Sequence, residues 1–191
     1  FDAVPIERVR DFWDDRPCNI RHSSAPVGTR RYFEEVTRQR YTVEPHIPTF
    51  ANFWAWSGKR VLEVGCGIGT ETVNFARAGA QVTATDISSV SLEIAFQRAE
   101  NYGLRAGFVE LDAEHLSEYL EGPFDLVWSF GVIHHSPHPQ RILTEMAVVT
   151  EHGATLKLMV YNRRSLKALR LTRGRWWRPE LIARQSEAQS G

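Results

Sequence analysis

The strongest constraint on the fold is a regular alternation of short apolar segments and amphipathic helical segments that begins at Lys59. It predicts strands over residues 60–64, 81–87, 106–112, 124–133 and 154–162. Helices are predicted over 70–78, around 92–99 and after Pro139, each closed by a glycine. Repeated strand–helix units of this length specify an α/β fold with a doubly wound, mostly parallel sheet and helices on both faces. The helical residues expected to face the core are Leu92, Ala95, Phe96, Ala99, Ile142, Leu143, Met146, Ala147 and Val149.

The segments around this alternation are less regular. With 191 residues the chain has the size of one domain, whose central part we place at residues 59–162. Residues 1–58, rich in aromatic residues, arginine and proline, are expected to form a lid or cap over the strand ends, with a helix around 29–40. Residues 163–191 are expected to start as a basic helix and to end in a solvated tail.

Charge and cysteine content exclude several classes of protein. The 23 basic and 23 acidic residues balance, so no global field favours nucleic acid or acidic lipid. No apolar run approaches the roughly 20 residues that cross a bilayer, and no secretory signal opens the chain. The two cysteines, Cys18 and Cys66, form no disulfide framework, so we expect a reduced, cytoplasmic protein. The first residue is Phe1 rather than Met, which suggests a trimmed chain or a fragment.

A glycine-rich loop follows the first predicted strand, in the segment VLEVGCGIGT of residues 61–70. A dinucleotide fingerprint that starts at Gly65 needs a glycine at position 70, where this chain has Thr70, and no lysine completes a phosphate loop. Glu63, at the end of the strand, would repel a pyrophosphate but suits a ligand that carries an ammonium group. The loop with Gly65, Gly67 and Gly69 therefore favours S-adenosylmethionine over NAD.

Two more carboxylates end the next two predicted strands. Asp86 can accept hydrogen bonds from both hydroxyls of a ribose, a feature that NAD enzymes share. Asp112 can accept the exocyclic amine of adenine, although it is also well placed to cap a helix. Acids at the ends of three successive strands strengthen the prediction of a nucleoside-containing cofactor.

With these motifs the chain resembles the class I S-adenosylmethionine-dependent methyltransferases. The segments VLEVGCGIGT, VTATDIS, LDAEHL and FDLVWSFGVIHHSPHPQRIL are similar, in order, to four motifs of that family and cover roughly residues 55–162. The resemblance implies that the three glycines lie against the methionine part of the cofactor, that Glu63 supports its ammonium, and that Asp86 and Asp112 hold the ribose and adenine. It further implies a site lined by Cys66, Ile87 and Ala113, with Ser129 and Phe130 beside the reactive methyl group.

In one respect the chain departs from that family. The family's sheet has seven strands, and the last two form an antiparallel hairpin. Residues 163–191 show no alternating pattern typical of strands. Either the chain is cut before the hairpin, which we favour, or the sheet has five strands.

The segment IHHSPHP holds three histidines, at positions 134, 135 and 138. We expect no metal there, because no carboxylate or cysteine stands nearby to complete a site. The alternatives are a structural hydrogen bond to backbone or an imidazole beside the methyl group, as general base or substrate orienter. By resemblance to the family's loop, His135 is the better candidate for catalysis, and His134 is expected to point into the protein.

Side chains of the N-terminal segment are candidates for closing the site. Tyr32, Tyr41 and His46 are predicted as lid or substrate contacts, with Glu44 as a further candidate. The alternative is that these side chains only pack on the sheet.

The acceptor of the methyl group is expected to be a small molecule. The Asn/Asp-Pro-Pro-Tyr/Phe motif of nucleic-acid N-methyltransferases is absent, since SFGV follows the fourth strand. Residues 163–178 contain seven basic side chains and two tryptophans, but an amphipathic helix explains them better than a nucleic-acid surface. The alternatives to an active methyltransferase are a protein that binds the cofactor without turnover and an NAD-dependent oxidoreductase. The product of transfer would be S-adenosylhomocysteine; the acceptor atom and the oligomeric state stay open.

Overall fold

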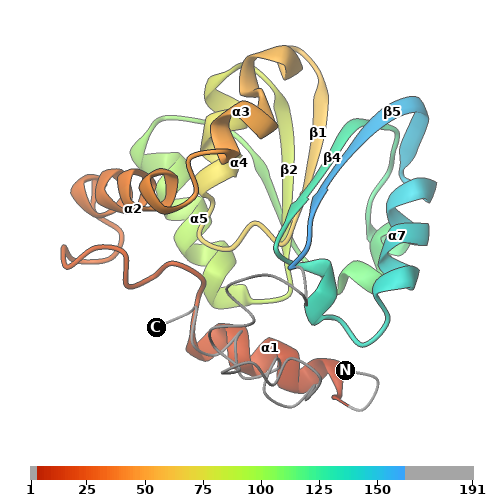
Figure 1. Ribbon diagram of the computed structural model, residues 1–191, viewed down its shortest axis with the longest axis horizontal. Coiled ribbons are helices and arrows are strands. Elements are labelled where there is room, and N and C mark those ends of the chain that lie inside the picture. The colour runs from red at the N-terminus through yellow and green to blue at the C-terminus, as the bar shows by residue number, and fades with distance from the viewer. Residues whose placement is uncertain (1–3, 162–191) are drawn as a thin grey trace, which may run out of the picture.

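A computed structural model describes residues 4–161 of the chain (Figure 1). The expectations for residues 163–191, namely the basic helix, the tail and the missing hairpin, lie outside the described residues. The N-terminal helices are α1 (Ile6–Asp15), α2 (Arg30–Val43), α3 (Ile47–Ala51) and the 3₁₀ helix η1 (Phe53–Trp56). The remaining elements are β1 (Arg60–Val64), α4 (Thr70–Arg77), β2 (Gln81–Asp86), α5 (Ser89–Asn101), β3 (Gly107–Glu110), η2 (Ala113–His115), α6 (Leu116–Tyr119), β4 (Phe124–Phe130), η3 (Ile133–His135), α7 (Pro139–Val148) and β5 (Thr150–Met159).

The five strands form one sheet in the order β3-β2-β1-β4-β5, and every neighbouring pair is parallel. Strand β1 lies at the centre, with Glu63 opposite Ala84 of β2 and Trp128 of β4. The order changes direction after β3, since β4 returns to the other side of β1. Such a switch point leaves a crevice at the carboxyl ends of the strands. The predicted doubly wound, Rossmann-like α/β fold is confirmed.

Helices cover both faces of the sheet, as predicted (Figure 1). On one face α6 and α7 pack against a core that contains Leu62, Val127 and Met146. On the other face α3 and α4 cover a second core around Val61 and Phe75. Alternate residues of a strand point to opposite faces, which explains why β1 contributes to both cores. Among the described residues, no helix has the length and apolar character needed to cross a membrane.

Two details differ from the predicted core. Phe96 of α5 is 49% exposed, because it lies at the rim of the sheet, where its ring meets that of Phe108 edge-on at 6.0 Å. In α7, Ile142 and Met146 are buried, whereas Leu143 and Ala147 are exposed. Ile142 and Met146 stand four positions apart and share one helix face, from which Leu143 and Ala147 are turned by about 100°.

The N-terminal segment has two parts. Helix α1 lies beyond the carboxyl ends of the strands, below the sheet in Figure 1. Helices α2 and α3 instead pack beside the sheet, where Phe33 and Ile47 are fully buried. Not all of residues 1–58 act as a lid: among the described residues, α1, the segment around Cys18 and Asn19, and the end of α2 with Arg40 and Glu44 face the crevice.

Candidate active site

The glycine-rich loop between β1 and α4 forms the floor of a pocket at the carboxyl ends of the strands. The N–H groups of Gly65 and Cys66 both donate to the Thr85 carbonyl, at 2.8 and 2.9 Å, which ties the loop to β2. Gly65 has a φ of +75°, and a Cβ atom there would lie 2.3 Å from Val132 Cγ2. Only glycine fits at this position, because a side chain would collide with the loop that follows β4.

Asp86, at the end of β2, fixes the middle of the glycine loop. Its Oδ2 accepts the Gly67 N–H at 2.8 Å and its Oδ1 accepts the Ser88 N–H at 2.9 Å. Burial raises the pKa of the carboxyl group, and these backbone hydrogen bonds oppose the rise. Each carboxylate oxygen has a second lone pair, so Asp86 can still accept hydrogen bonds from a ligand in the pocket.

Glu63, at the carboxyl end of β1, is a buried acid that also lines the pocket. Its Oε2 accepts a hydrogen bond from the Thr72 hydroxyl. Burial and the nearby Glu71 carboxylate raise the pKa of Glu63 to about 8. A cation placed beside Glu63 would compensate for this burial, so the position is suited to an ammonium group.

Arg40 of α2 reaches the same part of the pocket and was not predicted from the sequence. Its Nε donates to Glu71 at 2.8 Å and its Nη1 to Glu44 at 3.2 Å. Burial disfavours the charged guanidinium, but the attraction and hydrogen bond of Glu71, together with Cys18 and Glu44, outweigh this effect and raise the pKa of Arg40. Within the described part of the chain, Nη2 has no hydrogen-bond partner and can bind an anionic group of a ligand. No local pattern identifies Arg40, because its partner Glu71 lies 31 residues further along the chain.

Asp112 and its neighbours line the pocket beyond β3, together with Ile87 and Ala113. Oδ1 of Asp112 accepts the Glu114 N–H at 2.9 Å and so caps η2, the alternative that the sequence left open. The capping bond uses one oxygen, so the carboxylate retains acceptor sites for a ligand. Cys66 also lines the pocket, next to Gly65 and Gly67.

Phe130 and Ser129, at the end of β4, have different surroundings. Phe130 lines the pocket, and Arg40 lies over its ring at 5.5 Å. Ser129 is buried outside the pocket lining, and its hydroxyl has no hydrogen-bond partner among the described residues. Successive strand residues point to opposite faces, and here it is the Phe130 side chain that faces the pocket. The assignment of Ser129 to the site is corrected.

The two adjacent histidines also lie in different surroundings. His135 lines the pocket with its ring edge-on to Trp13 at 5.2 Å, and no described residue forms a hydrogen bond with its imidazole. Burial and the neighbouring His134 lower the pKa of His135 to about 3. His134 lies outside the lining and packs on Tyr161 at 4.5 Å, and both of its ring nitrogens are buried with no hydrogen-bond partner in the described part of the chain. Within residues 4–161, no three His, Cys, Asp or Glu side chains are grouped to hold a metal ion.

The structure does not bring Tyr32, Tyr41 or His46 to the pocket. The Tyr32 hydroxyl donates to the Ile20 carbonyl at 2.8 Å, and the Tyr41 hydroxyl accepts from Asn74 at 2.7 Å. His46 is exposed and packs behind Phe130 at 5.8 Å. The assignment of these three residues as pocket contacts is corrected, because α2 and α3 turn them toward neighbouring helices and solvent.

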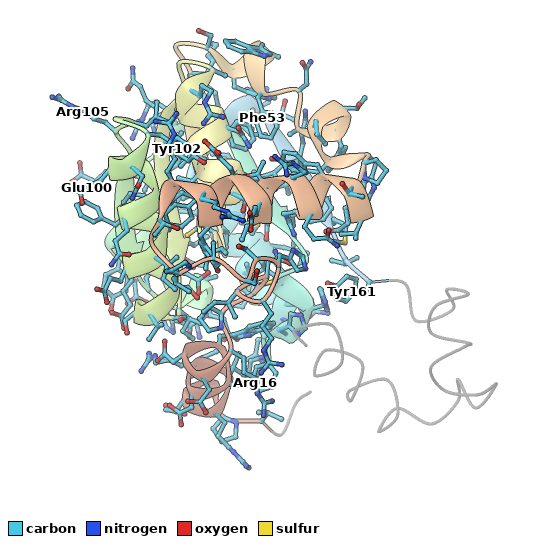
Figure 2. All side chains as sticks on the ribbon, turned by 90° about the vertical axis from the view of Figure 1, so that its left-hand side faces the viewer. Arg16, Phe53, Glu100, Tyr102, Arg105 and Tyr161 are labelled. Atoms are coloured by element: carbon cyan, nitrogen blue, oxygen red, sulfur yellow. The ribbon has the colours of Figure 1, made fainter. Side chains whose placement is uncertain are left out.

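Other residues complete the wall of the pocket and were not predicted. Helix α1 contributes Val9 and Trp13, the segment after it contributes Cys18 and Asn19, and the end of β5 contributes Met159, followed by Tyr161. Figure 2 shows Tyr161 at a height between α2 and the lower helix α1. The spacing of apolar residues in α1 could have indicated this role, since it is typical of a helix with one apolar face.

Comparisons with known proteins agree with this geometry. Residues 61–153 match the family model described as a methyltransferase domain. The chain is 30% identical over 112 residues to a ubiquinone biosynthesis O-methyltransferase of Nitrosococcus oceani, which covers 59% of this chain and 48% of that protein. The ubiquinone biosynthesis O-methyltransferase of Caulobacter sp. is 35% identical over 118 residues. This match covers 62% of this chain and 46% of the Caulobacter protein. The chain thus spans about half the length of these curated relatives.

Solved structures show the same likeness. A magnesium protoporphyrin IX methyltransferase from Synechocystis PCC 6803, crystallised with bound S-adenosylmethionine, is 26% identical with a TM-score of 0.58. The match covers 78% of this chain and 74% of that one. An arsenic(III) S-adenosylmethionine methyltransferase from Chlamydomonas reinhardtii is 30% identical with a TM-score of 0.54, over 60% of this chain and 43% of that one. With the parallel sheet, the glycine loop and the acids at three strand ends, these matches identify residues 61–153 as a methyltransferase domain of the class I S-adenosylmethionine-dependent kind.

Proposed function

We propose that this protein transfers a methyl group from S-adenosylmethionine to a small-molecule acceptor. The observation that carries the proposal is the pairing of opposite charges beside the glycine loop, where Glu63 and Arg40 both line the pocket. An amino acid presents an ammonium and a carboxylate, which these two side chains complement. Along the pocket from this amino-acid end, Asp86 lies where the ribose of the cofactor would bind, and Asp112 lies where its adenine base would bind. The described lining contains one arginine and no lysine, which does not suit a pyrophosphate.

The proposed assignment gives each residue one task. Glu63 binds the ammonium group, Arg40 Nη2 the carboxylate, Asp86 the ribose hydroxyls and Asp112 the adenine amine. Gly65, Gly67 and Gly69, with Cys66, Ile87 and Ala113, allow close contact along the ligand. When bound, S-adenosylmethionine supplies a sulfonium methyl group whose carbon–sulfur bond breaks as the acceptor attacks, and the electron pair stays on sulfur.

His135 is the proposed residue that meets the acceptor. Its lowered pKa leaves the imidazole neutral at physiological pH, so a ring nitrogen can accept a hydrogen bond from the acceptor's nucleophilic group. An imidazole with a pKa of about 3 is a weak base. We therefore assign His135 to orienting the acceptor. Phe130 and Trp13 exclude water from the same space.

The relatives support a small organic acceptor. Their names specify ubiquinone biosynthesis and magnesium protoporphyrin IX, which are not nucleic acids. We further propose a cytoplasmic location, because Cys18 and Cys66 are free thiols that line a binding pocket and a reducing compartment would keep them so.

The test is isothermal titration calorimetry with S-adenosylhomocysteine and, separately, NADH. We expect binding of S-adenosylhomocysteine and none of NADH. Gly67→Ala should weaken that binding at least tenfold, because the added methyl group would lie at the pocket floor beside Cys18 Cβ, 3.8 Å away. Gly103→Ala is the matched control: its φ of +64° is similar, and nothing lies within 4 Å. Binding of NADH instead would overturn the proposal, whereas binding of S-adenosylhomocysteine with no methyl transfer to any acceptor would indicate a protein without turnover.

A further inference from the structure

The pocket has two halves that differ in chemistry. The half at the ends of β1, β2 and β3 contains the carboxylates Glu63, Asp86 and Asp112. The other half, here called the acceptor half, is built by α1 and the ends of β4 and β5. It is lined by Val9, Trp13, Phe130, His135, Met159 and Tyr161. The strand order causes this division, because β4 and β5 lie on the opposite side of β1 from β2 and β3.

No formally charged side chain is among these six residues of the acceptor half, since His135 is neutral. The nearest charged lining residues are Arg40 and Glu44, and they are already paired with each other at 3.2 Å. Glu71 binds the same guanidinium at 2.8 Å, and the proposed function gives its remaining nitrogen, Nη2, to the carboxylate of the cofactor. An anionic acceptor would lose water in the acceptor half without gaining a free counter-charge from residues 4–161, and such desolvation is costly. A cationic acceptor would lie close to the sulfonium of the cofactor, which repels it.

The walls of the acceptor half are mostly aromatic. The Trp13 ring meets His135 at 5.2 Å with an interplanar angle of 74°, and His135 meets Tyr161 at 6.3 Å with an angle of 82°. Gly131 brings the backbone close to this wall, since a Cβ atom there would lie 3.5 Å from the Tyr161 hydroxyl oxygen and 3.3 Å from Met159 Cε. Edge-on and offset contacts with such rings stabilise a flat aromatic ligand beyond the effect of its buried area.

We infer that the acceptor half binds an uncharged, flat aromatic molecule between Trp13, Phe130 and Tyr161, with its nucleophilic group beside His135. The inference deepens the proposed function and rests on it, because that function places the methyl donor in the other half. The polar atoms that meet the ligand are the His135 imidazole and the Tyr161 hydroxyl, which suit a hydroxyl group on the ring.

The test measures binding of three probes of similar size to protein saturated with S-adenosylhomocysteine. The probes are 2-naphthol, 2-naphthoate and 2-naphthylmethylammonium. Their binding is measured by calorimetry at pH 7. We expect 2-naphthol to bind at least tenfold more tightly than either charged probe. Val9→Lys places a cation in the acceptor half and should strengthen 2-naphthoate binding at least fivefold. Val4→Lys, just before α1 and outside the lining, is the matched control and should change nothing.

The outcomes separate the two claims. If S-adenosylhomocysteine binds but a charged probe equals 2-naphthol, or none of the three probes binds, the inference is overturned and the proposed function stands. The inference is also overturned if Val4→Lys strengthens 2-naphthoate binding as much as Val9→Lys. If S-adenosylhomocysteine itself does not bind, the proposed function fails and the inference fails with it.

Discussion

Asp86 accepts the backbone N–H of Gly67 at 2.8 Å, which joins the end of β2 to the middle of the glycine loop. In Asp86→Asn an amide nitrogen or a neutral oxygen replaces the charged acceptor. We expect the affinity for S-adenosylhomocysteine to fall about 10- to 100-fold, since hydrogen bonds to charged groups contribute about 1.5–3 kcal/mol. Calorimetry measures the change. Asp125→Asn is the control, because Asp125 accepts the Arg60 N–H at 2.8 Å at the amino end of the sheet. Equal losses in both variants would contradict a role for Asp86 in the site.

Glu63 makes binding dependent on pH. Burial and Glu71 raise its pKa to about 8 in the empty pocket, so below that pH the free protein holds a proton on Glu63. An ammonium group stabilises the carboxylate, so the complex holds fewer protons than the free protein. The affinity for S-adenosylhomocysteine should therefore rise from pH 6 to pH 8, and binding at pH 7 should release a proton.

Calorimetry in buffers of different ionisation enthalpy counts the released protons. Glu63→Gln should bind more weakly and release fewer protons, because the amide does not titrate. An unchanged proton count in this variant would show that another group is responsible, and the nearest candidates are Glu71 and Asp86.

Helix α1 is held to the protein through Asp14. Its Oδ1 accepts from the Ser88 hydroxyl at 2.6 Å, and none of the side chains of α1 is fully buried. Asp14→Ala should raise the dissociation rate of S-adenosylhomocysteine about 3- to 10-fold, because a net hydrogen bond of about 1 kcal/mol is lost. Stopped-flow competition measures this rate. Asp11→Ala, at an exposed position of the same helix, should leave it unchanged; a similar increase there would indicate a general effect on the helix.

Arg98 joins α5 to the loop and to α2. Its guanidinium donates to the carbonyls of Ile68 at 3.1 Å and Phe33 at 3.0 Å while fully buried. Arg98→Met leaves both carbonyls without their partner and should lower the free energy of unfolding by about 3 kcal/mol. Arg105→Met is the control. Arg105 projects into solvent in Figure 2, and its replacement should change the free energy by less than about 0.5 kcal/mol. Denaturant unfolding compares the two variants, and equal losses would contradict the assignment.

Much of the sheet could be predicted because its signals are local. The five apolar segments, the glycines that end the helices and the acids at the strand ends are all visible within short windows. The strand starting at Thr150 rather than at residue 154 was harder to predict, since its first residues include Gly153 and the pairing with β4 shifts register between Phe124 and Leu126.

The rest of the site depends on contacts between distant residues. Arg40 reaches Glu71 only because α2 packs beside α4, and Trp13 reaches His135 only because α1 lies across the strand ends. Tyr32 was misplaced for the same reason, since the helix phase that buries it is set by its tertiary neighbours.

The order of strands around β1 also has a consequence for how such a protein can diverge. In the proposed assignment, the residues that recognise the methyl donor come from α2 and from the ends of β1, β2 and β3, while α1, β4 and β5 line the remaining space. Mutations in the second group leave the hydrogen bonds of Asp86 and the glycine loop in place. A lineage can therefore exchange one acceptor for another while it keeps its donor, and selection can act on the two preferences almost independently.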